Sequence, residues 1–191
     1  MPATNIEQLM GQMADFMNTR FFGKYRGIVT DISDPVGIGR ITAQVPAVFG
    51  ESPSPWAMPA SPFGGSKHGL FLLPEVNDGV WIEFEGGNPS LPIWSGFWWG
   101  NSGEVPDPKT EKARALTTSA GHQLVLDDDE NVVSLLHAGG GQVTISDSDI
   151  VISIGQCEIK MTASEINVNN GMLKITTAGA SLVNDAFKVG A

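Results

Sequence analysis

The side chains that could carry out chemistry are sparse in this sequence. Glu75 and Asp78 lie three residues apart, a spacing at which two carboxylates can share acid–base work. They fall in a turn-forming stretch, with no histidine or metal ligand close by in sequence, so we interpret them as turn residues. We predict no catalytic residues, and we expect that the protein is not an enzyme.

The potential metal ligands are equally scattered. His68, His122 and His137 are far apart, and no two of them have the spacing of a metal-binding pair. Cys157 is the single cysteine, which excludes an intrachain disulfide and a thiolate cluster. The acidic run 127–130 lacks the alternating ligands and closing bidentate acid of a calcium loop, so we interpret it as a solvated turn. We predict no metal and no cofactor.

The overall composition favours turn-rich β structure. The chain has 191 residues, 23 of them glycine, and only 17% are charged. The length fits one or two small domains. The formal net charge of −10, with no basic segment, argues against binding nucleic acid through its phosphates.

Residues 1–22 have a helical pattern. Ile6, Leu9, Met10, Met13, Phe16 and Met17 recur at spacings of three and four, which produces one apolar stripe. Thr4 and Glu7 have the spacing of a capping box, which predicts the start of the helix. No basic segment precedes an unbroken apolar run, so we expect no targeting signal here. The stripe either packs on its own domain or docks on a neighbouring subunit. For docking, the predicted hub-contact residues are Leu9, Met10, Met13, Phe16 and Met17.

From residue 23 to 101 the apolar period changes from helical to two. Strand patterns occupy 24–34, 40–46, 69–74, 79–87 and 91–101, and an Asp34–Pro35 turn follows the first of them. Five strands with almost no helix between them are typical of a small barrel such as an OB-fold. We therefore predict an all-β protein whose N-terminal helix precedes a five-stranded OB-fold barrel.

Residues 55–65 and 69–101 resemble the OB domain of phage baseplate assembly protein V and of the VgrG spikes of type VI secretion. The matching positions are Trp56, Ala57, Pro74, Glu75, Val76, Asp78, Val80, Phe84, Gly87, Pro89, Pro92 and Gly96. Asn77 stands where the family has glycine, and Asn88 stands where it has aspartate. Because asparagine tolerates a positive φ, we expect the same turn geometry at both positions.

Four of the five tryptophans lie between residues 81 and 99. OB-folds often stack bases on such rings, so the alternative function is an OB-fold module that binds nucleic acid or carbohydrate and carries a β-structured oligomerisation tail. Trp81 is flanked by Glu83 and Glu85, and no Lys or Arg lies between Lys67 and Lys109. We therefore expect no nucleic-acid partner, and we assign the rings to subunit contacts.

A polar linker is predicted at 102–116, and residues 117–191 then form a series of short alternating segments. A single ribbon of such narrow strands encloses no core, whereas three chains wound together would enclose one. We predict an intertwined trimeric β-helix needle in a homotrimer. The residues predicted to point inward are Val143, Ile145, Ile150, Ile152, Ile154, Cys157, Ile159, Met161, Ile166 and Val168.

Residues 118–145 also resemble the segment that follows the OB domain in these spikes. The resemblance implies a structural central spike, or puncturing tip, of a contractile phage tail or a phage-tail-like injection particle. The implied partners are baseplate hub and tail-tube proteins, a PAAR-type cap protein at the tip, and the target cell envelope. The implied location is a virion or extracellular particle that is assembled in the bacterial cytoplasm. Some related spikes carry a tip metal on a His-x-His motif or an inserted lysozyme; this chain lacks the motif, and its short linker leaves no room for an enzyme domain.

Overall fold

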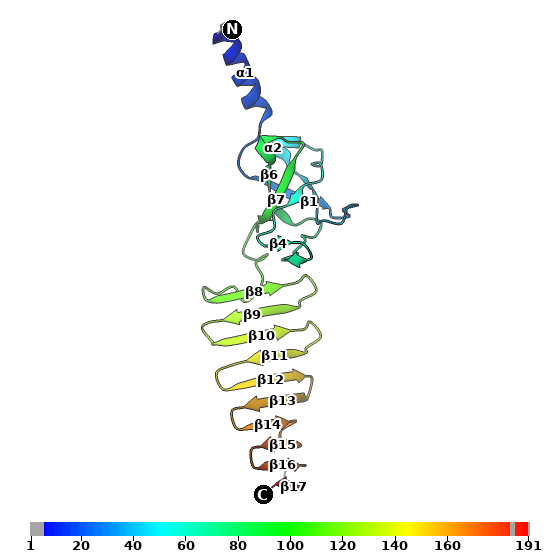
Figure 1. Ribbon diagram of the computed structural model, residues 1–191, viewed down its shortest axis with the longest axis vertical. Coiled ribbons are helices and arrows are strands. Elements are labelled where there is room, and N and C mark those ends of the chain that lie inside the picture. Colours follow the sequence, from blue (N-terminus) through cyan, green and yellow to red (C-terminus); the bar gives the residue numbers. More distant parts are fainter. Residues whose placement is uncertain (1–5, 184–185, 191) are drawn as a thin grey trace. The chain divides into compact units, whose positions relative to one another are not determined.

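The computed structural model describes residues 6–183 and 186–190, and the chain divides into two units, 1–102 and 103–191. Figure 1 labels most of the helices and strands of both units. Each unit is described by itself below. Among the described residues, no helix combines the length and apolar character that a transmembrane helix needs.

The N-terminal helix α1 spans Ile6–Thr19, as the apolar spacing predicted. No residue of α1 is buried, so its apolar stripe is uncovered in the single chain. This disagrees with the interpretation in which the stripe packs on its own domain. The predicted capping residue Thr4 lies outside the described residues.

The first unit contains a five-stranded sheet in the order β2-β1-β6-β7-β3. Its strands are β1 (Tyr25–Asp31), β2 (Thr42–Gln44), β3 (Met58–Pro59), β6 (Gly79–Phe84) and β7 (Pro92–Phe97). Short elements fill the connections: α2 (Pro46–Phe49), β4 (Gly64–Gly65), β5 (His68–Gly69) and the 3₁₀ turn η1 (Glu85–Gly87). A curled sheet of this kind agrees with the predicted all-β, OB-like fold.

The core of this unit follows from alternation along the strands. In β6, Val80, Ile82 and Phe84 are buried while the intervening residues are partly exposed. They pack in one cluster with Val29, Ile41, Ala43, Val45, Ala57 and Trp94. The indole N–H of Trp94 donates a hydrogen bond to the carbonyl of Gly39 at 3.0 Å, which satisfies the buried donor.

One predicted strand is wrong. Residues 69–74 do not join the sheet: only His68–Gly69 is extended, and it pairs with β4. The fifth strand is instead β3, which pairs in parallel with β7. Because β7 already has β6 on its other side, no edge of β7 remains for 69–74. The run Leu70–Leu72 is consequently exposed.

Turns account for the polar residues Asp34, Glu75 and Asp78 of this unit. The predicted Asp34 turn forms, and the Arg40 guanidinium beside Asp34 holds the pKa of that carboxyl well below its usual range. The Asp78 carboxylate accepts the backbone N–H of Glu75 at 2.8 Å, so both acids belong to a turn.

The asparagine prediction is right at one position and wrong at the other. Asn77 has a φ of +79°, as expected of a residue replacing glycine. Asn88 has a φ of −81°, and the positive φ angles fall on Gly86 and Gly87 instead. The Asn88 side chain accepts the N–H of Ser90 at 3.1 Å, a contact that an aspartate makes equally well.

The second unit is a ten-stranded antiparallel sheet in which each strand pairs with its neighbours in sequence. The first strands are β8 (Ala113–Thr117), β9 (Gln123–Asp127), β10 (Val132–Leu136), β11 (Gln142–Ile145) and β12 (Asp149–Ile154). The sheet continues with β13 (Cys157–Thr162), β14 (Glu165–Val168), β15 (Leu173–Thr176), β16 (Gly179–Leu182) and β17 (Phe187–Gly190). β8 begins inside the segment that was expected to be linker.

Candidate assembly surface

The register of the second unit aligns apolar side chains in two rows on one face of the sheet. The first row takes one residue from each strand: Leu116, Leu124, Leu135, Val143, Ile152, Ile159, Val168, Leu173, Leu182 and Phe187. The second row lies two residues along each strand; it begins at Arg114 and is apolar from β9 onward, with Leu126, Val133, Ile145, Ile150, Met161, Ile166, Ile175, Ala180 and Val189. Residues two apart on a strand share a face, so these rows define one surface, here called the apolar face.

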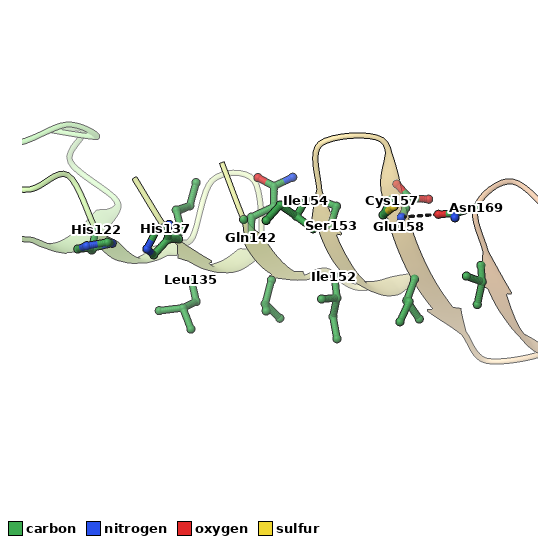
Figure 2. Close-up of a pocket in the computed structure, with 15 residues that line it drawn as sticks. His122, Leu135, His137, Gln142, Ile152, Ser153, Ile154, Cys157, Glu158 and Asn169 are labelled. Atoms are coloured by element: carbon green, nitrogen blue, oxygen red, sulfur yellow. Dashed lines mark hydrogen bonds between the residues drawn. The ribbon is translucent and has the colours of Figure 1, made fainter. Parts of the chain in front are cut away.

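The apolar face is uncovered in the single chain. Leu135 is 58% exposed, and Ile154, which continues the face at the edge of β12, is 63% exposed. An open groove of about 640 Å³ lies on this face between β10 and β14. Figure 2 shows Leu135 and Ile152 on one side of the groove, and Ile154 and Cys157 on the other. A soluble protein rarely leaves so continuous an apolar surface in water, so this face requires a partner.

Two family models match the chain, one in each unit. A model described as the type VI secretion system/phage-baseplate injector OB domain matches residues 25–99. A model described as the phage baseplate V C-terminal trimerisation domain matches residues 114–174. A comparison with curated proteins found no match. The two matched ranges together cover more than half of the chain.

The chain belongs to the phage baseplate V family.

As a member of this family, the chain is a baseplate spike protein of a phage or secretion-system particle, and its second unit is a trimerisation domain. Both matched domains are structural baseplate components. The resemblance noted in the sequence is therefore confirmed. The trimerisation domain implies that two further copies of the same chain are present in the assembly.

The residues predicted to form the trimer core are brought together by the structure. Every one of them, from Val143 to Val168, lies on the apolar face or at its edge. Whether they point inward in the trimer remains a prediction, since one chain shows the face but not its cover. Sequence reasoning missed the rows on β8–β10. There, Gln123–Asp127 and Val132–Leu136 place apolar residues at consecutive positions, so alternation alone does not select a face.

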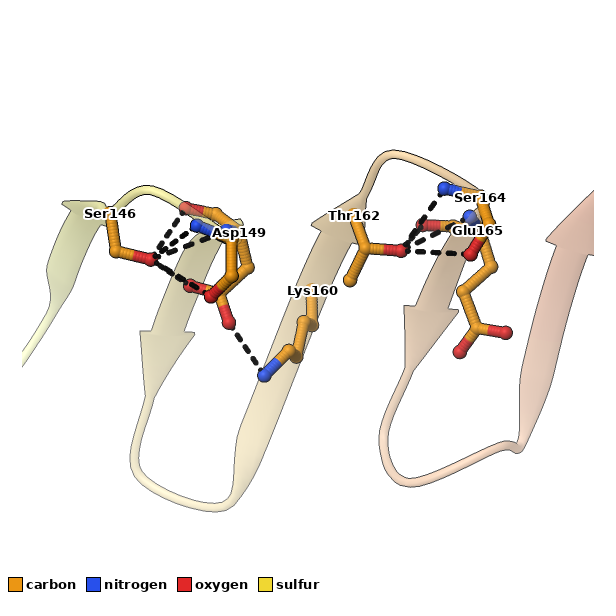
Figure 3. A network of polar contacts seen from close by, with 7 residues as sticks. Ser146, Asp149, Lys160, Thr162, Ser164 and Glu165 are labelled. Carbon is orange, nitrogen blue, oxygen red and sulfur yellow. Dashed lines mark hydrogen bonds and ion pairs between the residues drawn. The ribbon is translucent and has the colours of Figure 1, made fainter.

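The opposite face carries a repeated ion-pair motif on β12–β15, whereas on β8 and β9 it includes the buried residues Ala113 and Val125. Lys160 pairs with Asp149 at 2.7 Å, and one hairpin later Lys174 pairs with Glu165 at 2.5 Å. Each acid follows a hydroxyl three residues earlier, Ser146 or Thr162, which accepts the backbone N–H groups of the turn (Figure 3). The repeat fixes each turn and keeps charge off the apolar face.

These ion pairs lower the pKa of both carboxyl groups. The hydrogen bond from Lys160 lowers the pKa of Asp149, and that from Lys174 lowers the pKa of Glu165. A carboxyl whose pKa is lower in the folded state stabilises the fold above its unfolded pKa. That stabilisation is lost as the pH falls through the folded pKa. The unfolded values are 3.8 for Asp149 and 4.5 for Glu165, so the loss falls in the acid range below them.

We therefore expect the double variant Asp149→Asn and Glu165→Gln to have a lower thermal midpoint than wild type at pH 7. The difference should shrink at pH 3, because wild type then loses the same ion pairs. Thermal unfolding at both pH values measures it. The remaining carboxyl groups are the same in both proteins and change both thermal midpoints alike. A difference in thermal midpoint that is as large at pH 3 as at pH 7 would contradict this account.

Two histidines that seemed unrelated in sequence are neighbours. The rings of His122 and His137 have centroids 4.4 Å apart at the β9–β10 end of the apolar face. The Nδ1 atom of His122 accepts the N–H of Ala138 at 3.3 Å, and that of His137 accepts the N–H of Gly139 at 2.9 Å. Both rings thus close a turn. In residues 6–183 and 186–190, no group of three or more histidines, cysteines or acids is arranged to hold a metal.

The tryptophans of the OB domain are mostly engaged within it. The guanidinium of Arg26 lies 5.8 Å from the ring of Trp81 and 5.2 Å from that of Trp98. The indole of Trp98 also donates to the carbonyl of Val80 at 3.0 Å. Sequence reasoning missed Arg26 because it reaches Trp81 only through β1–β6 pairing. Trp99 is exposed and remains a candidate for the predicted subunit contacts.

Proposed function

We propose that this chain is the central spike of a contractile injection particle and that its second unit is the puncturing needle. The observation that carries the proposal is the apolar face, which continues through the whole ten-stranded sheet and lies for the most part within the trimerisation domain at 114–174. Three copies wound around their apolar faces would form a stiff rod with the ion-paired face outside. Intertwined chains unfold slowly, because one chain must disengage from the others, and slow unfolding suits a part that is driven through an envelope.

The remaining parts are assigned roles by the same proposal. The OB domains form a collar between the needle and the tail tube. The apolar stripe of α1, with Leu9, Met10, Met13, Phe16 and Met17, attaches the spike to the baseplate hub. No catalytic residue is needed for this mechanical role. The chain would be assembled into the particle in the bacterial cytoplasm and would meet the envelope of the target cell.

A tip partner is also proposed. In the described sheet β17 pairs only with β16, so its other edge is open. Phe187 and Val189 on this strand are both exposed. An open edge with apolar side chains invites further pairing or aggregation, so a cap protein of the PAAR type is the partner that we assign to it.

Localisation in the particle tests the proposed function. Gold-labelled antibody against the full-length chain should mark the baseplate end of purified particles, on the tail axis. A chain lacking residues 1–20 should still form a trimer by light scattering but should be depleted from particles, because the hub contact is gone. Labelling along the sheath or head would overturn the spike assignment. Normal incorporation of the shortened chain would overturn only the role of α1.

A further inference from the structure

The apolar residues of α1 follow a coiled-coil heptad. Ile6, Leu9, Met13 and Phe16 are separated by three, four and three residues, which places them at alternating a and d positions. The acids Glu7 and Asp15 fall at b and c positions, on the outer side. No charged residue borders the seam within α1, so identical helices would face one another without like-charge repulsion.

This seam is largely uncovered within the single chain, although the Phe16 ring lies 6.1 Å from that of Phe22. Ile6 is 73% exposed, and Leu9, Met13 and Phe16 are each at least 50% exposed. An isolated helix of 14 residues is marginal in water even with favourable residues. Something must therefore cover the seam if the helix is to persist in the assembled protein.

Two further copies of the same helix are at hand. The trimerisation domain holds three chains together, so three α1 helices are present in every assembly. Only residues 20–24 separate α1 from β1, a tether of at most about 20 Å at roughly 3.5 Å per residue. Such a short tether gives the helices a high effective concentration for one another. A threefold axis also makes them parallel and in register, as an a/d seam requires.

We propose that the three α1 helices of a trimer pack together as a parallel three-helix bundle through Ile6, Leu9, Met13 and Phe16. The bundle rests on the proposed trimer, and it narrows the proposed hub contact, because Leu9, Met13 and Phe16 then face one another instead of the hub. Met10 and Met17, at the e positions beside the seam, stay at the margin of the bundle, where the flexible methionine side chains meet the hub. Arg20, whose guanidinium lies 5.8 Å from the Phe16 ring, ends the seam.

Cysteine cross-linking of the full chain tests this bundle. In a Cys157→Ser background, Met13→Cys places one thiol in the seam of each copy. Ala14→Cys is the matched control, because the next residue lies about 100° around the helix. Neither residue is buried in the single chain, so neither change disturbs the two units. A trimaleimide reagent should give about tenfold more covalent trimer with Met13→Cys than with Ala14→Cys, as knobs-into-holes packing requires.

The outcomes separate the bundle from the rest of the assembly. Equal cross-linking at both positions, or none at either, in a protein that light scattering shows to be a trimer, would overturn the bundle and leave the spike assignment intact. A protein that is not a trimer before cross-linking would overturn both. Leu9→Cys, at a second seam position, should give as much covalent trimer as Met13→Cys. Agreement between the two shows that the result does not depend on one substitution.

Discussion

Ile152→Asp should abolish the trimer. Ile152 lies in the middle of the first apolar row, paired with Val143 on one side and Ile159 on the other. In a threefold assembly the substitution places three like charges in one layer, each removed from water and unpaired. An unpaired buried charge costs several kcal/mol, and the assembly would contain three of them. Light scattering should show loss of the wild-type mass, which is about three times the chain mass of 20.2 kDa.

The matched control is Ser153→Asp. Ser153 is the next residue on β12, so its side chain alternates to the face opposite Ile152, although the residue borders the groove. It pairs across the strands with Glu158, so the new charge costs at most about 1 kcal/mol, which should leave the trimer intact. A stable trimer of Ile152→Asp, or a monomeric wild-type protein, would refute the needle model.

Cys157 should resist thiol reagents in the native protein and react fully after denaturation. In the single chain Cys157 is exposed, so nothing within one chain protects it. It pairs with Ile154 at the edge of the apolar face, which the other two copies are expected to cover. Protection would therefore report assembly directly.

Titration with an aromatic disulfide reagent, with and without denaturant, measures this protection. The control is built in, because Ile152→Asp should make Cys157 react in the absence of denaturant. Native wild-type protein whose thiol reacts as quickly as the denatured thiol would place Cys157 outside the trimer interface.

Much of this fold follows from alternation, which is local. Strands β6, β12 and β13 were predicted because apolar residues recur at every second position, and one buried face requires that pattern. The face of β9 and β10 was not predictable, since Leu124, Val125 and Leu126 satisfy either face. The choice between β3 and 69–74 depended on which segment reaches the edge of β7, and that is a long-range property.

The side-chain contacts were the least predictable part. His122 and His137 are separated by 15 residues, and only the register of β9 and β10 brings their rings together. Arg26 reaches two indoles through a strand pairing that sequence spacing does not encode. The uncovered seam of α1 was visible as an apolar stripe, but its freedom from the rest of the unit required the exposed fractions.

The strictly sequential pairing of β8–β17 makes the length of this sheet modular. Neighbouring strands lie about 4.8 Å apart, so one hairpin adds roughly 10 Å. The hairpins begun by Ser146 and Thr162 repeat the same turn, the same ion pair and the same two apolar rows. A duplicated or deleted hairpin keeps every other side chain on its own face, because the register on either side is unchanged. The second unit can therefore become longer or shorter by whole hairpins while the first unit stays unchanged.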